Sequence, residues 1–225
     1  MSNVILGIPS KGRVSRIVDN LIRINNLHLI SSSTRSYFGN FSVSNNWKVK
    51  LMSATSIANE LINGNLNFGL TGLDLMLEVL KEDTSRNFIK MIKKFELSTA
   101  SIGFLVPISW YNVNSIDDLL VLSLNKDIII STKYVNVTQN YINSKGWNTF
   151  KVVSCSSTSE IEPFSDKCDI IVDVLSSGKT AKHNLLKPII GGKIIDTCLC
   201  MFYNCRPAMA LKDIELIHLL CDIIY

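Results

Sequence analysis

Short runs of β-branched residues alternate with helical patterns along most of this 225-residue chain. The first run, at residues 4–8, is broken by Pro9 and Gly12. A pattern with apolar residues on one helical face follows at residues 14–24. Such alternation is typical of an α/β fold in which helices cover a largely parallel sheet. We therefore expect an α/β fold.

The same alternation predicts the remaining elements and their grouping. Strands are expected at residues 47–52, 68–72, 101–106, 128–131, 150–153, 168–175 and 198–203. Helices are expected after Ser53 or Thr55, from Asp74, from Ser115, through Tyr141 to Lys145, briefly from Ser157, and over 211–225. The units fall into two groups, which predicts two lobes: residues 1–101 plus 185–225, and residues 102–184.

Charge and hydropathy limit the classes of function. The chain has 23 basic and 19 acidic residues, a net charge of +4, and its lysines form no stripe interleaved with aromatic residues. This excess is too small for a dedicated nucleic-acid binder and suits a small anionic ligand better. No apolar run reaches the ~18 residues of a membrane-spanning helix, and the N-terminus lacks the apolar stretch of a signal peptide. We expect a cytoplasmic protein that binds neither nucleic acid nor membrane.

The six cysteines indicate free thiols rather than a metal site. None forms a C-x-x-C pair, and Cys198 and Cys200 lie in an apolar run that predicts a buried strand. Structural zinc needs about four ligands at workable spacing, whereas the three histidines are far apart in the sequence. We expect no metal held by protein residues alone.

Residues 169–180 contain the strongest candidate site. A buried strand carrying Asp169 and Asp173 leads into a small, hydroxyl-rich turn and then a helix. Helix N-termini bind phosphate through unpaired N–H groups. A Walker A loop would need glycine where Asp173 stands, so that motif is absent. A sugar phosphate fits better, with the acids beside the ribose and the turn on the 5-phosphate. An ordinary turn whose acids cap or pair locally is the open alternative.

A second candidate lies between the first strand and the first helix. Lys11 and Arg13 flank Gly12 at a helix N-terminus, where the helix dipole disfavours positive charge. An anionic ligand would compensate this charge; two solvated cations are the alternative. The turn from Gly69 to Gly72 is a weaker candidate, because such turns are mostly conformational. No Ser/His/Asp or Cys/His grouping supports covalent catalysis.

Several of these segments match one known family in the same order along the chain. They are Gly-Ile-Pro-Ser-Lys-Gly-Arg at 7–13, Arg-Ser-Tyr at 35–37, Phe-Gly-Leu-Thr-Gly-x-Asp at 68–74, Ser-Thr-Lys-Tyr at 131–134, Glu160 with Pro163, and residues 169–180 with His-Asn-Leu at 183–185. Together they resemble the catalytic subunit of ATP phosphoribosyltransferase, the first enzyme of histidine biosynthesis.

The resemblance implies a fold, a reaction and a site. The fold would have two lobes like type II periplasmic binding proteins, with the active site in the interlobe cleft. N1 of the ATP adenine would displace pyrophosphate from C1 of phosphoribosyl pyrophosphate, with Mg²⁺ bound to substrate. The implied catalytic residues are Lys11, Arg13, Asp169 and Asp173. The implied substrate-binding residues are Ser10, Gly12, Arg35, Gly72, Asp74, Glu160, Ser176, Ser177, Gly178, Lys179 and Thr180.

The resemblance also implies partners. The length matches a short form without a regulatory domain, which would form a homodimer and assemble with a regulatory subunit resembling histidyl-tRNA synthetase. The chain departs from many family members at Asn67, where they carry Asp, and at Ala100 and Ser101, where they carry Cys-Arg. The missing Arg would remove a phosphate contact.

Two alternatives to the transferase remain. One is a non-catalytic cytoplasmic module that binds a small anion on the same fold, and Ser101 is the position that favours it. The other is an inactive scaffold that assembles with a partner through the apolar face of the helix expected at 211–225.

Overall fold

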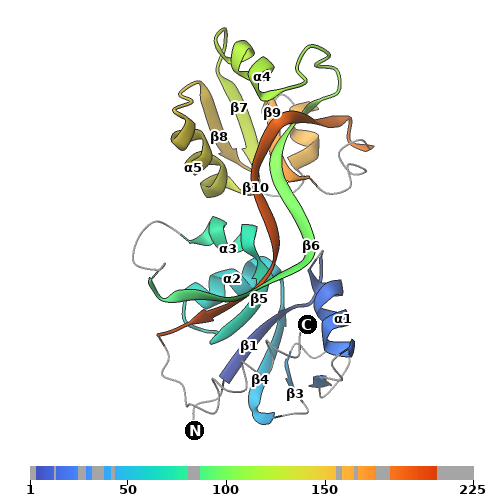
Figure 1. Ribbon diagram of the computed structural model, residues 1–225, viewed down its shortest axis with the longest axis vertical. Helices are drawn as coiled ribbons and strands as arrows, with labels where there is room; N and C mark the ends of the chain where they lie inside the picture. The colour runs from blue at the N-terminus through green and yellow to red at the C-terminus, as the bar shows by residue number, and fades with distance from the viewer. Residues whose placement is uncertain are drawn as a thin grey trace. The chain divides into compact units, whose positions relative to one another are not determined.

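The chain divides into two compact units in the computed structural model (Figure 1). Unit 1 comprises Met1–Ser98 and Cys198–Tyr225, and unit 2 comprises Thr99–Thr197. The structure describes residues 4–12, 14–24, 29–31, 38–41, 44–80, 87–155, 159–164, 167–175 and 183–206. The lobe boundaries expected from the sequence stay a prediction. Among the described helices, none is long and apolar enough to cross a membrane.

Three parallel strands form the centre of unit 1. β1 (Val4–Pro9) lies between β4 (Ser44–Met52) and β5 (Phe68–Gly72) and pairs with both in parallel. Because parallel strands end at the same edge of a sheet, the segments that follow these three strands lie at one edge. All three strands were expected from the sequence.

Antiparallel strands flank this parallel centre. β2 (Leu29–Ser31) and β3 (Phe38–Phe41) continue the sheet beyond β4. On the other side, β10 (Leu186–Asn204) runs antiparallel to β5. The sheet is therefore mixed, and the expectation of a largely parallel sheet holds only for its centre.

Helices cover both faces of the unit 1 sheet. Alternate strand residues point to opposite faces. Leu6 and Ile8 of β1 belong to a core with Val18 of α1 (Ser15–Ile24). The opposite core joins Ile57 and Leu61 of α2 (Ala54–Ile62) to Met76 of α3 (Leu73–Val79). Ser53 caps α2 as expected, because its side chain accepts a hydrogen bond from the Ser56 N–H.

The strand β10 also carries the expected buried thiols. Cys198 and Cys200 are 1% and 0% exposed and point to the α2 face of the sheet. Their Sγ atoms lie 3.7 Å apart. Burial, with a smaller contribution from Cys198, raises the pKa of Cys200 to about 12. Both thiols are free, as predicted, and act as small core hydrophobes.

Unit 2 repeats the parallel arrangement. β7 (Ile128–Thr132) pairs in parallel with β8 (Phe150–Ser154) and with β9 (Ile170–Leu175). β6 (Ile89–Pro107) runs antiparallel to β9. β7, β8 and β9 were expected, whereas the sequence did not indicate that β6 begins as early as Ile89 or that β10 begins at Leu186, well before the strand expected at 198–203.

Two helices and a short 3₁₀ helix surround the unit 2 sheet. α4 (Ile116–Ser123) begins with a capping box between Ser115 and Asp118. α5 (Val135–Lys145) ends before Gly146, as predicted, and this glycine caps the helix in the left-handed conformation. The 3₁₀ helix, η2, covers Ser159–Phe164. The capping box expected at Ser157 and the helix expected at 211–225 lie outside the described residues.

Candidate functional site

The carboxyl edge of the unit 1 sheet carries the first group of predicted site residues. Ser10 directly follows β1, and its N–H donates to the Met52 carbonyl at 2.9 Å. Ser10, Lys11 and Gly12 are exposed. Gly12 has a φ of +92°, a conformation that disfavours other residues. The Ser15 hydroxyl donates to the Gly12 carbonyl at 3.0 Å and closes the turn into α1. Lys11 therefore lies in the exposed turn between β1 and the N-terminus of α1.

Gly72 and Asp74 lie at the same edge. The register that pairs Gly7 with Gly69 brings the end of β5 level with the turn after β1. Asp74, in the first turn of α3, is only 2% exposed. A Cβ atom on Gly72 would lie 2.2 Å from the Asp74 Oδ1 atom, so only glycine leaves room for this carboxylate. The structure therefore brings together Ser10, Lys11, Gly12, Gly72 and Asp74.

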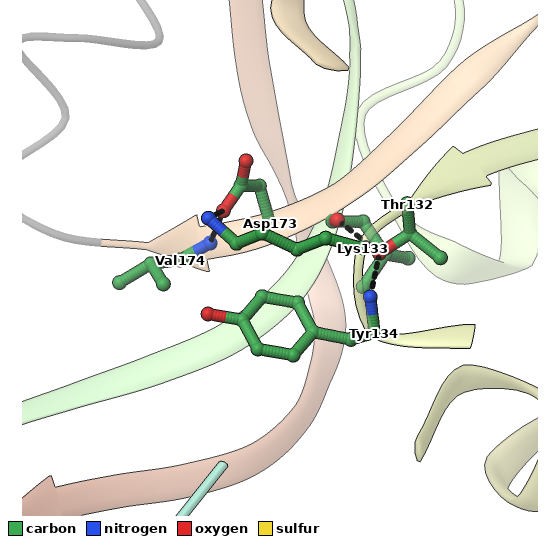
Figure 2. Close-up of polar contacts among 6 residues, drawn as sticks. Thr132, Lys133, Tyr134, Asp173 and Val174 are labelled. Carbon is green, nitrogen blue, oxygen red and sulfur yellow. Dashed lines mark hydrogen bonds and ion pairs between the residues drawn. The ribbon is translucent and has the colours of Figure 1, made fainter. Parts of the chain in front are cut away.

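The carboxyl edge of the unit 2 sheet carries an ion pair between Lys133 and Asp173 (Figure 2). The Lys133 Nζ atom lies 3.1 Å from Asp173 Oδ1, which also accepts the Val174 N–H at 2.7 Å. The Asp173 side chain is 12% exposed, whereas that of Lys133 is 51% exposed. The Lys133 ammonium also lies 5.2 Å from the centre of the Tyr134 ring. A nearly buried carboxylate is thus held beside a cation that solvent can reach.

Thr132 fixes the segment that carries this cation. Its hydroxyl donates to the Val172 carbonyl at 2.7 Å and accepts the Tyr134 N–H at 2.9 Å (Figure 2). The first bond connects the end of β7 to β9, and the second fixes the turn that follows β7, so Lys133 is placed relative to Asp173 by the sheet itself. Sequence reasoning quoted Lys133 within a matching motif but gave it no role. The sequence places Lys133 directly after an expected strand, but its closeness to Asp173 follows from the pairing of β7 with β9, which the sequence does not show.

Asp169 lies at the opposite end of the same strand. Its carboxylate forms an ion pair with Lys126, and its Oδ2 atom accepts the Ile129 N–H at 2.8 Å. Lys126 also lies 5.4 Å from the centre of the Trp110 ring. The structure therefore does not bring Asp169 together with Asp173. Asp169 pairs locally at the start of β7 and β9, and this placement gives its predicted catalytic role no support.

The other predicted residues cannot be placed with their side chains. Arg13, Arg35 and the turn of Ser176, Ser177, Gly178, Lys179 and Thr180 lie outside the described residues. For Glu160 only the backbone is described, within η2. Residue 176 follows directly after β9, whose last residue is Leu175. The roles of all these residues stay predictions.

The two departures from the family pattern have structural partners. The Asn67 Oδ1 atom accepts the Ile5 N–H at 2.9 Å, so this side chain holds the start of β5 to β1. The Ser101 hydroxyl donates to Asp196 Oδ1 at 2.7 Å, and the second oxygen of Asp196 accepts from Lys193 at 2.8 Å. A cation, Lys193, is therefore linked through Asp196 to the position of the missing Arg.

Metal ligands do not gather in the part of the chain that the structure describes. Among those residues, no three histidine, cysteine or acidic side chains are grouped so that they could hold a metal ion. Asp173 is the acid at the unit 2 site, and its Oδ1 atom is occupied by Lys133 and Val174.

The fold defines the class of protein. Two α/β units carrying polar groups at the carboxyl ends of parallel strands are typical of the two-lobed fold of type II periplasmic binding proteins. The structure is similar to the arginine-bound form of truncated ArgBP from Thermotoga maritima, with a TM-score of 0.57 and 11% identity over 99% of this chain and 95% of the other. It is more similar to a chain of the ATP phosphoribosyl transferase (HisG:HisZ) complex from Thermotoga maritima, with a TM-score of 0.73 and 20% identity over 98% of each chain.

Sequence comparison then identifies the family. The ATP phosphoribosyltransferase family model, HisG, matches residues 53–223. The ATP phosphoribosyltransferase of Chelativorans sp. (strain BNC1) is 30% identical over 215 residues, covering 91% of this chain and 93% of the relative. That of Sinorhizobium fredii (strain NBRC 101917 / NGR234) is 28% identical over 213 residues, or 91% of both chains. The chain belongs to the ATP phosphoribosyltransferase family, as the sequence motifs predicted.

Proposed function

We propose that this chain transfers the phosphoribosyl group of phosphoribosyl pyrophosphate to N1 of ATP and releases pyrophosphate, the first step of histidine biosynthesis. Family membership supports the reaction. One observation of the structure carries the assignment of the site: Asp173, within β9, forms an ion pair with Lys133, which follows β7, and β9 ends at Leu175, directly before the turn predicted at residues 176–180. That turn is the predicted holder of the 5-phosphate.

The reaction depends on positioning the two substrates more than on a nucleophilic side chain. The bond from C1 of the ribose to a pyrophosphate oxygen breaks, the electron pair leaves with pyrophosphate, and N1 of adenine bonds to C1. Binding both substrates in line supplies much of the acceleration, and cations stabilise the negative charge on the leaving group. The Asp173 carboxylate would accept hydrogen bonds from the ribose hydroxyls, and Lys11 would lie near the polyphosphates. The buried Asp74 carboxylate would bind substrate beside Lys11.

Mg²⁺ is the proposed cofactor and would be held mainly by the substrate. Mg²⁺ is commonly bound by substrate phosphates with one or two carboxylates and several waters. The described residues fit that mode, because they offer single acids at the site rather than a cluster of ligands. When bound, Mg²⁺ would neutralise charge on the pyrophosphate. Asp173 would orient the ribose in either case.

The proposed partner is a regulatory subunit resembling histidyl-tRNA synthetase. The similar structure from Thermotoga maritima comes from a HisG:HisZ complex, which supports a hetero-oligomer for this chain. A homodimer and a cytoplasmic location remain part of the proposal on the basis of the family resemblance.

Substrate-omission assays test the proposed function. We expect the purified chain, alone or with its regulatory subunit, to release pyrophosphate only when ATP, phosphoribosyl pyrophosphate and Mg²⁺ are all present. Calorimetry measures the binding of phosphoribosyl pyrophosphate in the same samples. Saturable binding without turnover, both for the chain alone and for the chain with its regulatory subunit, would contradict the transferase and favour the anion-binding module. No binding at all would show that the turn at residues 176–180 does not hold phosphate.

A further inference from the structure

Two groups contact the Oδ1 atom of the Asp173 carboxylate. Its Oδ1 atom lies 2.7 Å from the Val174 nitrogen and 3.1 Å from the Lys133 Nζ atom. The Val174 N–H belongs to the neighbouring residue and fixes the carboxylate only locally. Lys133 comes from the end of another strand, β7, and therefore fixes the carboxylate relative to the sheet (Figure 2).

The segment carrying Lys133 is itself held in place. Thr132 bridges the Val172 carbonyl and the Tyr134 N–H, and Tyr134 is 2% exposed. The ammonium extends over the Tyr134 ring toward Asp173 (Figure 2). This ion pair is not primarily a stabilising contact, because pairs with a half-exposed partner contribute little to stability. Its consequence is the fixed direction in which the carboxylate points.

We propose that Lys133 is a positioning residue for the phosphoribosyl substrate: it orients the Asp173 carboxylate toward the ribose hydroxyls. The inference rests on the proposed function, because it takes the ribose as the partner of Asp173. Lys133 acts through Asp173 and makes no direct contact with the pyrophosphate. A carboxylate that already has its binding orientation loses less conformational freedom when the substrate binds. This raises the affinity for the substrate.

A double-mutant cycle tests this dependence on Asp173. The calorimetric affinity for phosphoribosyl pyrophosphate with MgCl₂ is measured for the native chain, Lys133→Met, Asp173→Asn and the double variant. We expect Lys133→Met to weaken binding about tenfold in the native background and by less than about twofold in the Asp173→Asn background, since residues in one network are coupled. Equal loss in both backgrounds, or no loss in the native one, would overturn the proposal.

Two fragments of the substrate provide a second measurement that does not need the Asp173 variant. Lys133→Met should weaken the binding of ribose 5-phosphate by about the same factor as that of the whole substrate, and it should leave the affinity for inorganic pyrophosphate unchanged. The opposite pattern would mean that Lys133 contacts the pyrophosphate directly and would overturn the proposal.

Matched variants separate this effect from charge and folding. Lys133→Arg keeps a cationic donor and should restore affinity to within about threefold of the native chain. Lys151→Met removes a comparable lysine of unit 2, whose side chain is 63% exposed and paired with Asp127, and should leave affinity unchanged. If the native chain binds no phosphoribosyl pyrophosphate, the proposed function fails; if it binds and the cycle is additive, only the positioning role fails.

Discussion

Thr138 shows at the scale of one residue how a buried polar group costs stability. This residue of α5 is 0% exposed, and its hydroxyl oxygen has no hydrogen-bond partner. Replacing an unsatisfied buried hydroxyl by a methyl group of the same shape removes a desolvation penalty. We expect Thr138→Val to raise the free energy of unfolding by about 1 kcal/mol, measured by urea denaturation. A loss of stability would show that the hydroxyl is satisfied in solution.

Residue-scale reasoning also explains what the sequence did and did not reveal about the site. Asp169 and Asp173 are four residues apart, a distance of about 13 Å along an extended strand. The sequence predicted one strand over residues 168–175 that carries both acids beside the ribose, and the role of Asp169 there stays a prediction. β9 begins at Ile170, so Asp169 stands before the strand and Asp173 near its end. Lys133 was overlooked because its partner lies on another strand and strand order is not visible in one sequence.

The capping box of α4, formed by Ser115 and Asp118, makes the stability of this helix depend on pH. Hydrogen bonds from the Asn114 N–H and then from the Ser115 hydroxyl lower the pKa of Asp118 below its ordinary value of 3.8. A carboxyl group whose pKa is lowered by folding stabilises the fold above its unfolded-state pKa and loses that effect as pH falls through the folded-state pKa.

Asp118→Asn should therefore reduce stability most near neutral pH. The difference in the free energy of unfolding between the native chain and this variant should shrink when the pH is lowered from about 6 to about 3. Denaturation curves at several pH values measure it. A difference that stays constant over this range would contradict the proposed role of the carboxylate as a cap.

The turn from β5 into α3 requires glycine at residue 72, because a side chain there would occupy the space of the Asp74 carboxylate. A Cβ atom at residue 72 would displace the Asp74 carboxylate, since the two atoms would be 2.2 Å apart. We expect Gly72→Ala to cost about 1–3 kcal/mol of stability and to abolish most of the pyrophosphate release. Steady-state assays at a temperature where the variant is folded measure the second effect.

Gly146→Ala is the matched control for this variant. Gly146 has a φ of +67°, and a Cβ atom there would meet nothing within 4 Å. The substitution should cost about 1 kcal/mol through backbone strain alone and leave activity unchanged. Equal activity of the Gly72→Ala and Gly146→Ala variants would contradict a role for Asp74 in substrate binding.

Element prediction succeeded where the pattern was local. The strands of the parallel centres and the caps at Ser53 and Ser115 follow from β-branched runs and hydroxyl residues. β2 and β3 have three and four residues and were not expected. β2 pairs with β3, and β3 pairs with β4. This pairing stabilises the two short strands, and the local sequence pattern does not predict it. The early start of β6 likewise falls in a stretch rich in lysine, where strand propensity is low.

At the scale of the whole molecule, each unit has the same design. Parallel strands end at one edge, and polar residues at or just beyond the carboxyl ends of these strands form the candidate site: Lys11 and Asp74 in unit 1, and Lys133 and Asp173 in unit 2. The fold class and the family were predictable because the motifs occur in a fixed order along the chain. The network around Asp173 was not, because it depends on three-dimensional pairing of strands.

The central claim is that a bond forms between C1 of the ribose and N1 of adenine. The most direct measurement is mass and NMR analysis of the nucleotide formed from ATP and phosphoribosyl pyrophosphate by the chain with its regulatory subunit. The account predicts a product carrying one phosphoribosyl group on N1, formed in equal amount with pyrophosphate. Unchanged ATP, or a phosphoribosyl group attached elsewhere, would contradict it.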